Sequence, residues 1–162
     1  MEHIWSPWRM NYIMNHEHKD CCIFCDALEH EDGSENLVAY RGKRAYVILN
    51  RYPYTNGHLM VVPNDHQPSM EDLDVETRGE LMELLSSSVR ILRSVYNPEG
   101  FNVGTNIGGA AGAGVAGHVH FHVVPRWAGD TNFMTTTGNA RVLPEELCQT
   151  YDRISKAWLE KE

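Results

Sequence analysis

The sequence is short of basic residues. Its 162 residues include 14 Lys and Arg against 22 Asp and Glu, giving a formal net charge of -8 at pH 7. A protein that binds a nucleic-acid backbone needs a basic surface to displace counterions from the phosphates, so this balance argues against a nucleic-acid partner. Small anions remain possible ligands, because imidazole rings and backbone N–H groups hold them locally whatever the overall charge.

A long apolar run is also missing. The opening residues, MEHIWSPWRM, carry an early acid and no hydrophobic stretch. We therefore expect neither a signal peptide nor a membrane span. These absences predict a cytoplasmic protein that does not bind a membrane and whose thiols stay reduced. A chain of this length can bury a core without disulfides.

Three histidines at alternate positions mark the segment from Gly117 to Trp127, which reads GHVHFHVVPRW. Successive side chains of a β-strand point to opposite faces, so His118, His120 and His122 are expected to share one face. The apolar residues between them would share the other. Imidazole serves as nucleophile, proton carrier or metal ligand near neutral pH, so this row indicates a functional site.

Cys22 and Cys25 have the C-x-x-C spacing that lets two thiolates reach one zinc ion. A closed zinc site needs two further ligands, which the spacing alone does not identify. A redox dithiol would require a thioredoxin-like context with the motif opening a helix, and the sequence does not show one. From the residues alone, zinc binding and plain free thiols both remain open.

Hydrophobic period and turn residues predict five strands and two helices. We expect strands over 37–41, 45–49, 58–62, 101–106 and 117–127. A long helix is expected over 69–95, opened by a capping box of Ser69 and Asp72. A terminal helix is expected over 144–160, with Cys148 buried in it.

The loop over residues 107–117 consists mainly of glycine and alanine. Residues 112–117 match the dinucleotide-binding pattern G-x-G-x-x-G, but the loop leads into a strand rather than a helix. This context excludes the dinucleotide-binding fold. Because glycine lets backbone amides approach an anion closely, the loop is a candidate phosphate cradle beside the histidine row.

These segments resemble the histidine triad (HIT) family. HVHFHVV is similar to the family signature, GHLMVVP followed by His66 is similar to an earlier family strand, and FNVGTNIG to the strand before the glycine loop. Three further segments are most similar to the bacterial diadenosine tetraphosphate phosphorylase branch: WSPWRMNY, YRGKRAYVILNRYPYTNGHL and VVPRWAGDTNF. The resemblance covers nearly the whole chain.

The resemblance implies an α+β fold in which an antiparallel sheet of about five strands packs with one long helix and a C-terminal helix. It implies a single HIT domain over 1–162. This domain would comprise an N-terminal arm (1–20), a core with the zinc site and the triad (21–127), and a C-terminal loop and helix (128–162). Family members usually pair, so a homodimer or a higher homo-oligomer is expected.

The resemblance also implies a chemistry. His120 would attack the α-phosphorus of a nucleotide and form a nucleotidyl-histidine intermediate, with His122 and His58 in support. The implied substrate contacts are made by Asn50 to the ribose, by the phosphate-loop residues Asn106, Gly112, Ala113 and Gly114, and by Trp127. Relatives with this C-x-x-C bind a structural zinc ion, and the corresponding ligands here are Cys22, Cys25, His66 and His118.

One departure from the family affects the second step. Hydrolases usually place Gln or Ser just before the triad, where this chain has Ala113 and Gly114. Inorganic phosphate rather than water would then resolve the intermediate, giving ADP and ATP from diadenosine tetraphosphate. Hydrolysis of dinucleoside polyphosphates or phosphoramidates, and nucleotide binding with vestigial activity, are the alternatives. A further alternative is a single catalytic metal held by all three triad histidines.

Overall fold

A computed structural model describes residues 22–130 and 143–160. The expected N-terminal arm, residues 1–20, lies outside the described residues, as does most of the loop that follows the triad strand. Within the described ranges, no helix has the length and apolar character needed to cross a membrane.

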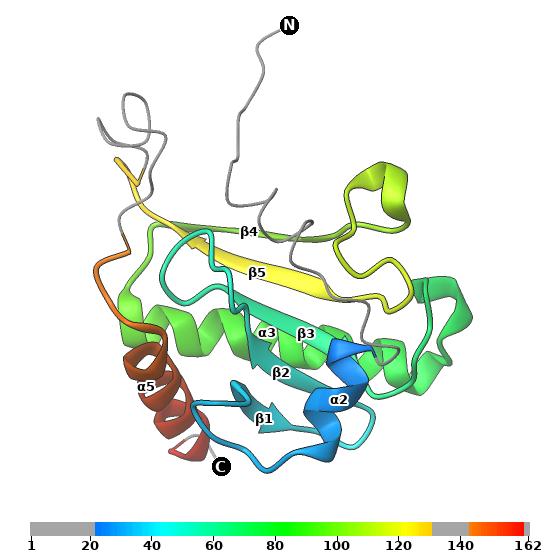
Figure 1. The fold of residues 1–162 in the computed structure, drawn as a ribbon. Coiled ribbons are helices and arrows are strands. Elements are labelled where there is room, and N and C mark those ends of the chain that lie inside the picture. The colour runs from blue at the N-terminus through cyan, green and yellow to red at the C-terminus, as the bar shows by residue number, and fades with distance from the viewer. Residues whose placement is uncertain (1–21, 131–142, 161–162) are drawn as a thin grey trace, which may run out of the picture.

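The fold is built on a five-stranded antiparallel sheet, which confirms the expected α+β class (Figure 1). Its strand order is β1-β2-β3-β5-β4. The strands are β1 Val38–Arg41, β2 Ala45–Leu49, β3 Leu59–Pro63, β4 Gly100–Thr105 and β5 Phe121–Arg126. The first four lie within one residue of the ranges expected from the sequence.

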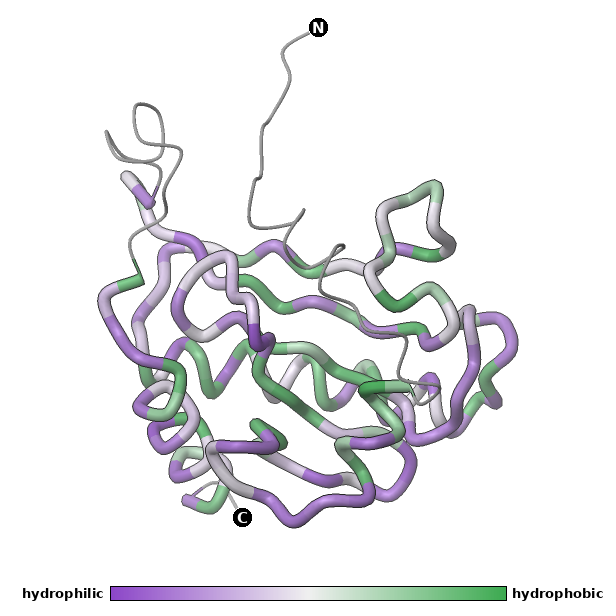
Figure 2. Tube along the Cα trace, in the orientation of Figure 1, coloured by the Kyte–Doolittle hydropathy of each residue, from purple (hydrophilic) through white to green (hydrophobic). Residues whose placement is uncertain are grey.

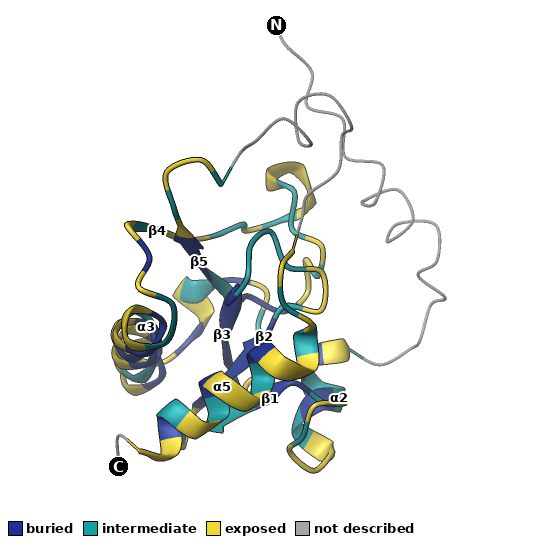
Figure 3. Ribbon diagram, turned by 90° about the vertical axis from the view of Figure 1, so that its left-hand side faces the viewer, coloured by how far each residue is buried: buried dark blue, intermediate teal, exposed yellow. Residues whose placement is uncertain are grey.

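In the described residues, three α-helices pack around the sheet: α2 Ile23–Glu29, α3 Val75–Tyr96 and α5 Leu147–Leu159. Two short 3-10 helices cover Met70–Asp72 and Gly109–Ala111. Figure 3 places α3 and α2 on opposite sides of the sheet. Every residue of β2 and β3 is buried between these layers, and Figure 2 shows hydrophobic residues concentrated along the middle of the fold.

The register of β3 and β5 assigns side chains to the two faces of the sheet. Met60 pairs with His122, and Leu59 pairs with Val123. Since strand neighbours alternate between faces, His122 and Met60 share one face while Leu59 and Val123 share the other. The face that carries His122 is therefore fixed by the packing of its apolar neighbours on the opposite side.

The long helix begins six residues later than the capping-box pattern indicates. Asp74 is its N-cap, and the Asp74 side chain accepts a hydrogen bond from the Thr77 N–H at 2.6 Å. Leu73 is extended and interrupts helical geometry, so Ser69 opens only the 3-10 turn and donates its hydroxyl to Glu71. The prediction failed because two adjacent segments offered cap residues, and the chain turns at Leu73 to bury that side chain.

The terminal helix also begins later than expected, at Leu147. Glu146 is its N-cap and forms a capping box with Gln149. Cys148 is exposed, which corrects the prediction that it is buried. The helix instead packs through Ile154 and Trp158, and the indole of Trp158 stacks on Tyr40 with ring centroids 4.5 Å apart.

The triad strand is shorter than the alternating sequence predicts. β5 starts at Phe121, so only His122 belongs to it. The Val119 N–H donates to the Gln67 carbonyl oxygen at 2.7 Å, in the loop that follows β3. His118 and His120 therefore lie outside the residues that pair β3 with β5. The three histidines do not occupy one regular strand.

Candidate active site and metal centre

Four metal-binding side chains from three separate segments lie together. Cys22 and Cys25 come from the start of α2, His66 from the loop after β3, and His118 from the segment before β5. Their ligand atoms all lie within 4.8 Å of one another. The cluster could therefore hold a metal ion, and it contains the residues expected from the sequence.

Three sulfur-to-nitrogen distances within this cluster lie in the range found around a zinc ion. Cys22 Sγ lies 3.4 Å from His118 Nδ1, and Cys25 Sγ lies 3.3 Å from His66 Nδ1 and 3.7 Å from His118 Nδ1. Ligands held tetrahedrally around one zinc ion lie about 3.3 to 3.8 Å apart. Two thiolates and two imidazoles also form one of the common donor sets of structural zinc sites.

Hydrogen bonds to main-chain carbonyl oxygens orient the residues around the candidate metal centre. His118 Nε2 lies 2.9 Å from the Pro63 carbonyl oxygen and donates to it, which leaves the Nδ1 lone pair facing the thiols. The Tyr46 hydroxyl donates to the Phe24 carbonyl oxygen at 2.8 Å and so ties α2 to β2. Burial, followed by the charges of Cys22 and Cys25, raises the pKa of Tyr46, so this hydroxyl keeps its proton.

His120 presents one unprotonated ring nitrogen. Its Nδ1 lies 2.9 Å from the carbonyl oxygen of His118 and donates a proton to it. Burial lowers the pKa of His120, which is 4 % exposed, so the ring is neutral at pH 7. A neutral imidazole with its proton on Nδ1 has a lone pair on Nε2, and none of the described residues makes a hydrogen bond to that atom. This is the state that a nucleophile requires.

A pair of imidazoles, buried His58 and half-buried His122, lies beside the candidate nucleophile. His58 Nε2 is 3.0 Å from His122 Nδ1, and the Tyr54 N–H donates to His58 Nδ1 at 3.1 Å. Burial, followed by the nearby His120, lowers the pKa of His122 to about 4. The rings of His120 and His122 meet edge to face with centroids 5.0 Å apart, so the pair directly adjoins the candidate nucleophile.

The triad histidines do not converge on one metal. His118 turns Nδ1 toward the thiols, whereas His120 Nδ1 is bonded to a carbonyl oxygen. Among the described residues, the one cluster of three or more Cys, His, Asp or Glu donors includes only His118 from the triad. The geometry thus disfavours a catalytic metal held by all three rings and separates a metal ligand from the two remaining imidazoles.

Asn50 and the glycine loop flank the histidine row. Asn50 Oδ1 accepts from the Tyr52 N–H at 2.9 Å, and Asn50 Nδ2 lies 3.4 Å from His58 Nε2. In the loop, the Gly112 N–H donates to Gly109 at 3.0 Å and the Ala113 N–H donates to Gly108 at 3.4 Å. Two of the amides expected to hold phosphate thus already bond within their own turn.

The other expected substrate residues lie at the ends of β4 and β5. Asn106 and Trp127, which directly follow these strands, are both half-buried. The Trp127 N–H donates to Asp130 at 3.4 Å, and Asp130 also binds the Arg126 guanidinium at 2.9 Å. These bonds fix the turn that carries Trp127.

Three neighbours of the site were not among the functional residues predicted from the sequence. Phe24 packs against both His118 and His120, with centroids 5.5 and 4.8 Å apart. The Thr105 hydroxyl donates to the His120 carbonyl oxygen at 2.7 Å. Tyr54 contacts the His58 ring at 4.6 Å. Only their positions beside motif residues, in CIFC, FNVGTN and NRYPYTNGH, could have singled them out.

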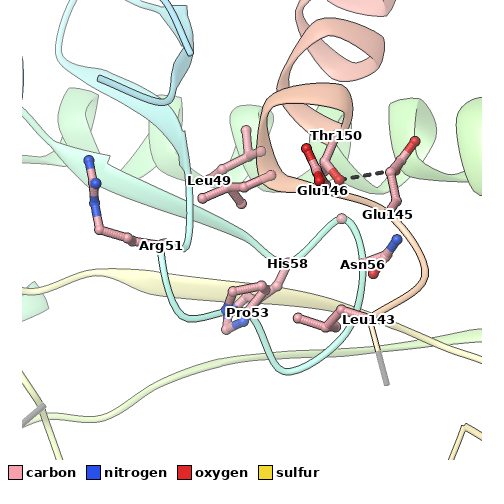
Figure 4. Close-up of a pocket in the computed structure, with 11 residues that line it drawn as sticks. Leu49, Arg51, Pro53, Asn56, His58, Leu143, Glu145, Glu146 and Thr150 are labelled. Atoms are coloured by element: carbon pink, nitrogen blue, oxygen red, sulfur yellow. Dashed lines mark hydrogen bonds between the residues drawn. The ribbon is translucent and has the colours of Figure 1, made fainter. Parts of the chain in front are cut away.

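A cavity of about 300 Å³ lies behind the turn that leads into His58 (Figure 4). Its lining comes from the end of β2, the turn, and the start of α5: Leu49, Arg51, Pro53, Asn56, Gly57, His58, Leu143, Glu145, Glu146, Leu147 and Thr150. His58 is the one histidine in this lining, and it connects the cavity to the histidine row through its contact with His122.

The fold and the row of three histidines, two of them buried, define a histidine triad protein. Residues 32–129 match the HIT domain, and the chain belongs to this family, which confirms the resemblance seen in the sequence. The chain is 40% identical to AP-4-A phosphorylase of Mycobacterium tuberculosis H37Rv over 166 residues, covering 98% of this chain and 85% of that protein. It is 30% identical over 143 residues to an uncharacterized HIT-like protein of Saccharolobus solfataricus, and the match covers 86% of this chain and 96% of that protein.

Solved structures share the fold. A zinc-bound histidine triad family protein from Mycobacterium smegmatis superposes with a TM-score of 0.69 at 26% identity, covering 88% of this chain and 96% of that one. A hypothetical histidine triad nucleotide-binding protein from Sulfolobus tokodaii gives a TM-score of 0.66 at 27% identity, covering 86% of this chain and 90% of that one. The diadenosine triphosphate hydrolase of Plasmodium falciparum, at 19% identity and a TM-score of 0.63, covers 87% and 99% and shows the fold alone.

Proposed function

We propose that this protein cleaves dinucleoside polyphosphates such as diadenosine tetraphosphate through a nucleotide bound covalently to His120. The observation that carries the proposal is the hydrogen bond from His120 Nδ1 to the His118 carbonyl oxygen, which leaves the Nε2 lone pair available. The 40% identity to an AP-4-A phosphorylase supports the same class of substrate. A cytoplasmic enzyme of this kind would act on free nucleotides.

The first step is an in-line displacement. His120 Nε2 attacks the α-phosphorus of diadenosine tetraphosphate, the bond from this phosphorus to the bridging oxygen breaks, and ATP leaves. The product on the protein is adenylyl-His120. Because His120 is neutral before the attack, burial serves the reaction by keeping the lone pair unprotonated at pH 7.

The second step regenerates the imidazole. An oxygen of inorganic phosphate attacks the adenylyl phosphorus, the bond to Nε2 breaks, and ADP leaves. Water in the same place would yield AMP. Ala113 and Gly114 bring no side chain that can position water, and the similarity to an AP-4-A phosphorylase favours phosphate.

His122 and His58 stabilise, through hydrogen bonding, the negative charge that develops on the leaving oxygens. With His58 Nε2 donating to His122 Nδ1, a neutral His122 ring carries its own proton on Nε2. This N–H stands beside the nucleophile, where it stabilises negative charge on the phosphoryl oxygens. The two rings thus act as a supporting pair rather than as nucleophiles.

The remaining contacts hold the nucleotide. Asn50, next to His58, would bind the ribose hydroxyls, and Trp127 would stack on an adenine. The loop residues Asn106, Gly112, Ala113 and Gly114 would surround the phosphates. Since two loop amides already bond within the turn, phosphate binding requires either the remaining donors or a rearrangement of this loop.

Zinc is the metal proposed for the cluster of Cys22, Cys25, His66 and His118. When bound, it supplies structural cross-linking, because four ligands leave no open coordination position for substrate. The donor set and its distances support this assignment, as does the zinc-bound relative. The metal would join the start of α2 to the segment that positions His120.

A homodimer is proposed through the edge of the sheet. β4 is an edge strand, and Val103 in it is 49% exposed. Ile107, just beyond the strand, is 40% exposed. An open strand edge with apolar side chains is suited to pairing with a second copy of the chain.

The function is tested by mixing the zinc-loaded protein with diadenosine tetraphosphate, with and without inorganic phosphate, and separating the products. Phosphate-dependent ADP together with ATP is expected. AMP and ATP without a phosphate requirement would establish the hydrolase alternative instead. A protein that binds AMP but turns over no faster than its His120→Asn variant would be a nucleotide-binding protein with vestigial chemistry.

A further inference from the structure

Tyr54 determines which nitrogen of His58 carries the proton. A backbone N–H is only a donor, so the Tyr54 N–H at 3.1 Å makes His58 Nδ1 an acceptor. The proton of a neutral His58 ring therefore lies on Nε2. His122 Nδ1, 3.0 Å from Nε2, can accept it.

The Asn50 amide nitrogen, near His58 Nε2, cannot accept this proton. Asn50 Nδ2 lies 3.4 Å away and is itself a donor, because the Asn50 oxygen already accepts from the Tyr52 N–H. The hydrogen bond therefore runs from His58 to His122. A single main-chain N–H at Tyr54 sets the direction of the imidazole pair.

The Tyr54 side chain also covers this pair. Its ring lies 4.6 Å from the His58 ring at 34° and 6.2 Å from the His122 ring at 32°. These tilted, offset contacts place one aromatic ring against both imidazoles. His58 is only 1% exposed, so water has little access to it.

The turn that carries Tyr54 is anchored from two sides. The Thr55 hydroxyl donates to the Pro125 carbonyl oxygen at 2.9 Å, and the His58 N–H donates to the Thr55 carbonyl oxygen at 3.3 Å. Gly57 adopts φ +76° and lies against Leu92. The cavity of Figure 4 borders the same turn at Pro53 and Asn56. On that side the turn is therefore held by these hydrogen bonds rather than by packed side chains.

We propose that Tyr54 is a positioning residue for the reaction, in which its N–H orients the His58–His122 hydrogen bond and its ring keeps water from the pair. This inference rests on the proposed function for its catalytic meaning. Tyr54 touches no reacting atom and acts through the two histidines.

Loss of the ring should change how His122 titrates. Burial is the main cause of its low pKa, so removing the cover should raise the pKa from about 4 toward the ordinary 6.5. Among the described residues, the titratable side chains in contact with His122 are His58, His120 and Tyr54. A His122 that protonates near neutrality would lose its acceptor role toward His58.

The test compares Tyr54→Ala and Tyr54→Phe with a control, Tyr52→Ala, in the zinc-loaded protein. Tyr52 lies in the same turn, but 52% of it is exposed. The histidine ring signals are followed by ¹⁵N NMR from pH 4 to 8. Tyr54→Phe and the control should titrate like wild type, whereas Tyr54→Ala should raise the His122 pKa by about one unit or more, a tenfold change in the protonation constant.

Turnover gives a second measurement. Tyr54→Ala should lower kcat at pH 6 by up to about fourfold, the loss expected if the His122 pKa reaches 6.5, and leave KM within about twofold, because the ring is not a substrate contact. Tyr54→Phe should retain kcat. If Tyr54→Ala does not fold, Tyr54→Leu leaves part of the pair uncovered, and the same rise in the His122 pKa is expected.

An unchanged His122 titration in the folded Ala or Leu variant would overturn the proposal. Equal effects of Tyr54→Phe and Tyr54→Ala would also do so, since they would assign the role to the hydroxyl. The NMR titration needs no substrate, so a wild-type protein without turnover would refute the proposed function while leaving this test of Tyr54 intact.

Discussion

The backbone carbonyl oxygen of His118 accepts the Nδ1 proton of His120 at 2.9 Å. The His118 ring meanwhile turns its own Nδ1 toward Cys22 and Cys25, at 3.4 and 3.7 Å. One residue thus serves the metal centre with its side chain and the candidate nucleophile with its main chain. A metal bound at the cluster would hold in place the acceptor that fixes the His120 tautomer.

Removal of one zinc ligand should destabilise the fold. In Cys22→Ser we expect the bound zinc to be lost and the melting temperature to fall by about 10 °C, corresponding to about 3 kcal/mol, because the cross-link between α2 and the His118 segment disappears. Metal analysis and differential scanning calorimetry measure the two effects. Cys148→Ser is the matched control, since Cys148 is exposed and lies in α5. Equal melting temperatures for both variants would refute a structural metal.

Stability should fall with acidification because buried histidines must be neutral. The pKa of His122 is lowered by burial from 6.5 to about 4, so the folded state binds its proton less readily than the unfolded chain. The stabilising contribution is therefore complete above pH 6.5 and declines as the pH falls toward 4. Between pH 7 and 5 this one group accounts for about 2 kcal/mol.

Urea unfolding at several pH values measures this contribution. His122→Asn, which cannot titrate, should lose less stability than wild type between pH 7 and 5. Parallel pH profiles for the two proteins would show that His122 is not protected from protonation in the fold.

Gly57 should not tolerate a side chain. Its φ is +76°, and an added Cβ would lie 2.9 Å from Leu92 Cδ2 and 3.2 Å from the Tyr96 ring. We expect Gly57→Ala to cost about 2 kcal/mol and to reduce turnover, since His58 is the next residue. Chemical denaturation and kinetic assays measure these effects.

Gly79→Ala provides the contrasting control. Gly79 lies within α3, and a Cβ there would have no atom within 4 Å. Alanine should stabilise the helix by about 1 kcal/mol without changing turnover. A Gly57→Ala variant as stable as Gly79→Ala would contradict the close approach of α3 to the turn.

The start of α3 can be tested at its cap. Asp74→Ala should lower stability by about 1 kcal/mol, because the Thr77 N–H loses its acceptor. Asp74→Asn keeps a side-chain oxygen at the same place and should retain most of this stability. Similar losses for Ala and Asn would indicate that the ion pair of Asp74 with Arg44, rather than the cap, supports this helix end.

The elements were predictable wherever local chemistry decides them. β2 is found over the expected residues because its apolar run is bounded by turn residues and buried on both faces. The start of α3 was not predictable in the same way. Ser69 and Asp74 are both good cap residues, and the burial of Leu73 between them selects Asp74. The sequence likewise did not show whether Cys148 points to the core or to solvent, because that depends on which face of α5 packs against the sheet.

The sequence by itself determined the chemical groups available: a C-x-x-C pair, a row of imidazoles and a glycine loop before them. It also determined the five strands, since hydrophobic period and turns are local properties, but it did not indicate α2, at whose start the C-x-x-C pair lies. Only the tertiary structure decided which groups meet. Cys22 and His118 are 96 positions apart, and their contact depends on packing α2 against the sheet. The proton positions on His58 and His120 were decided there too, because the partners that fix them are main-chain groups placed by the fold.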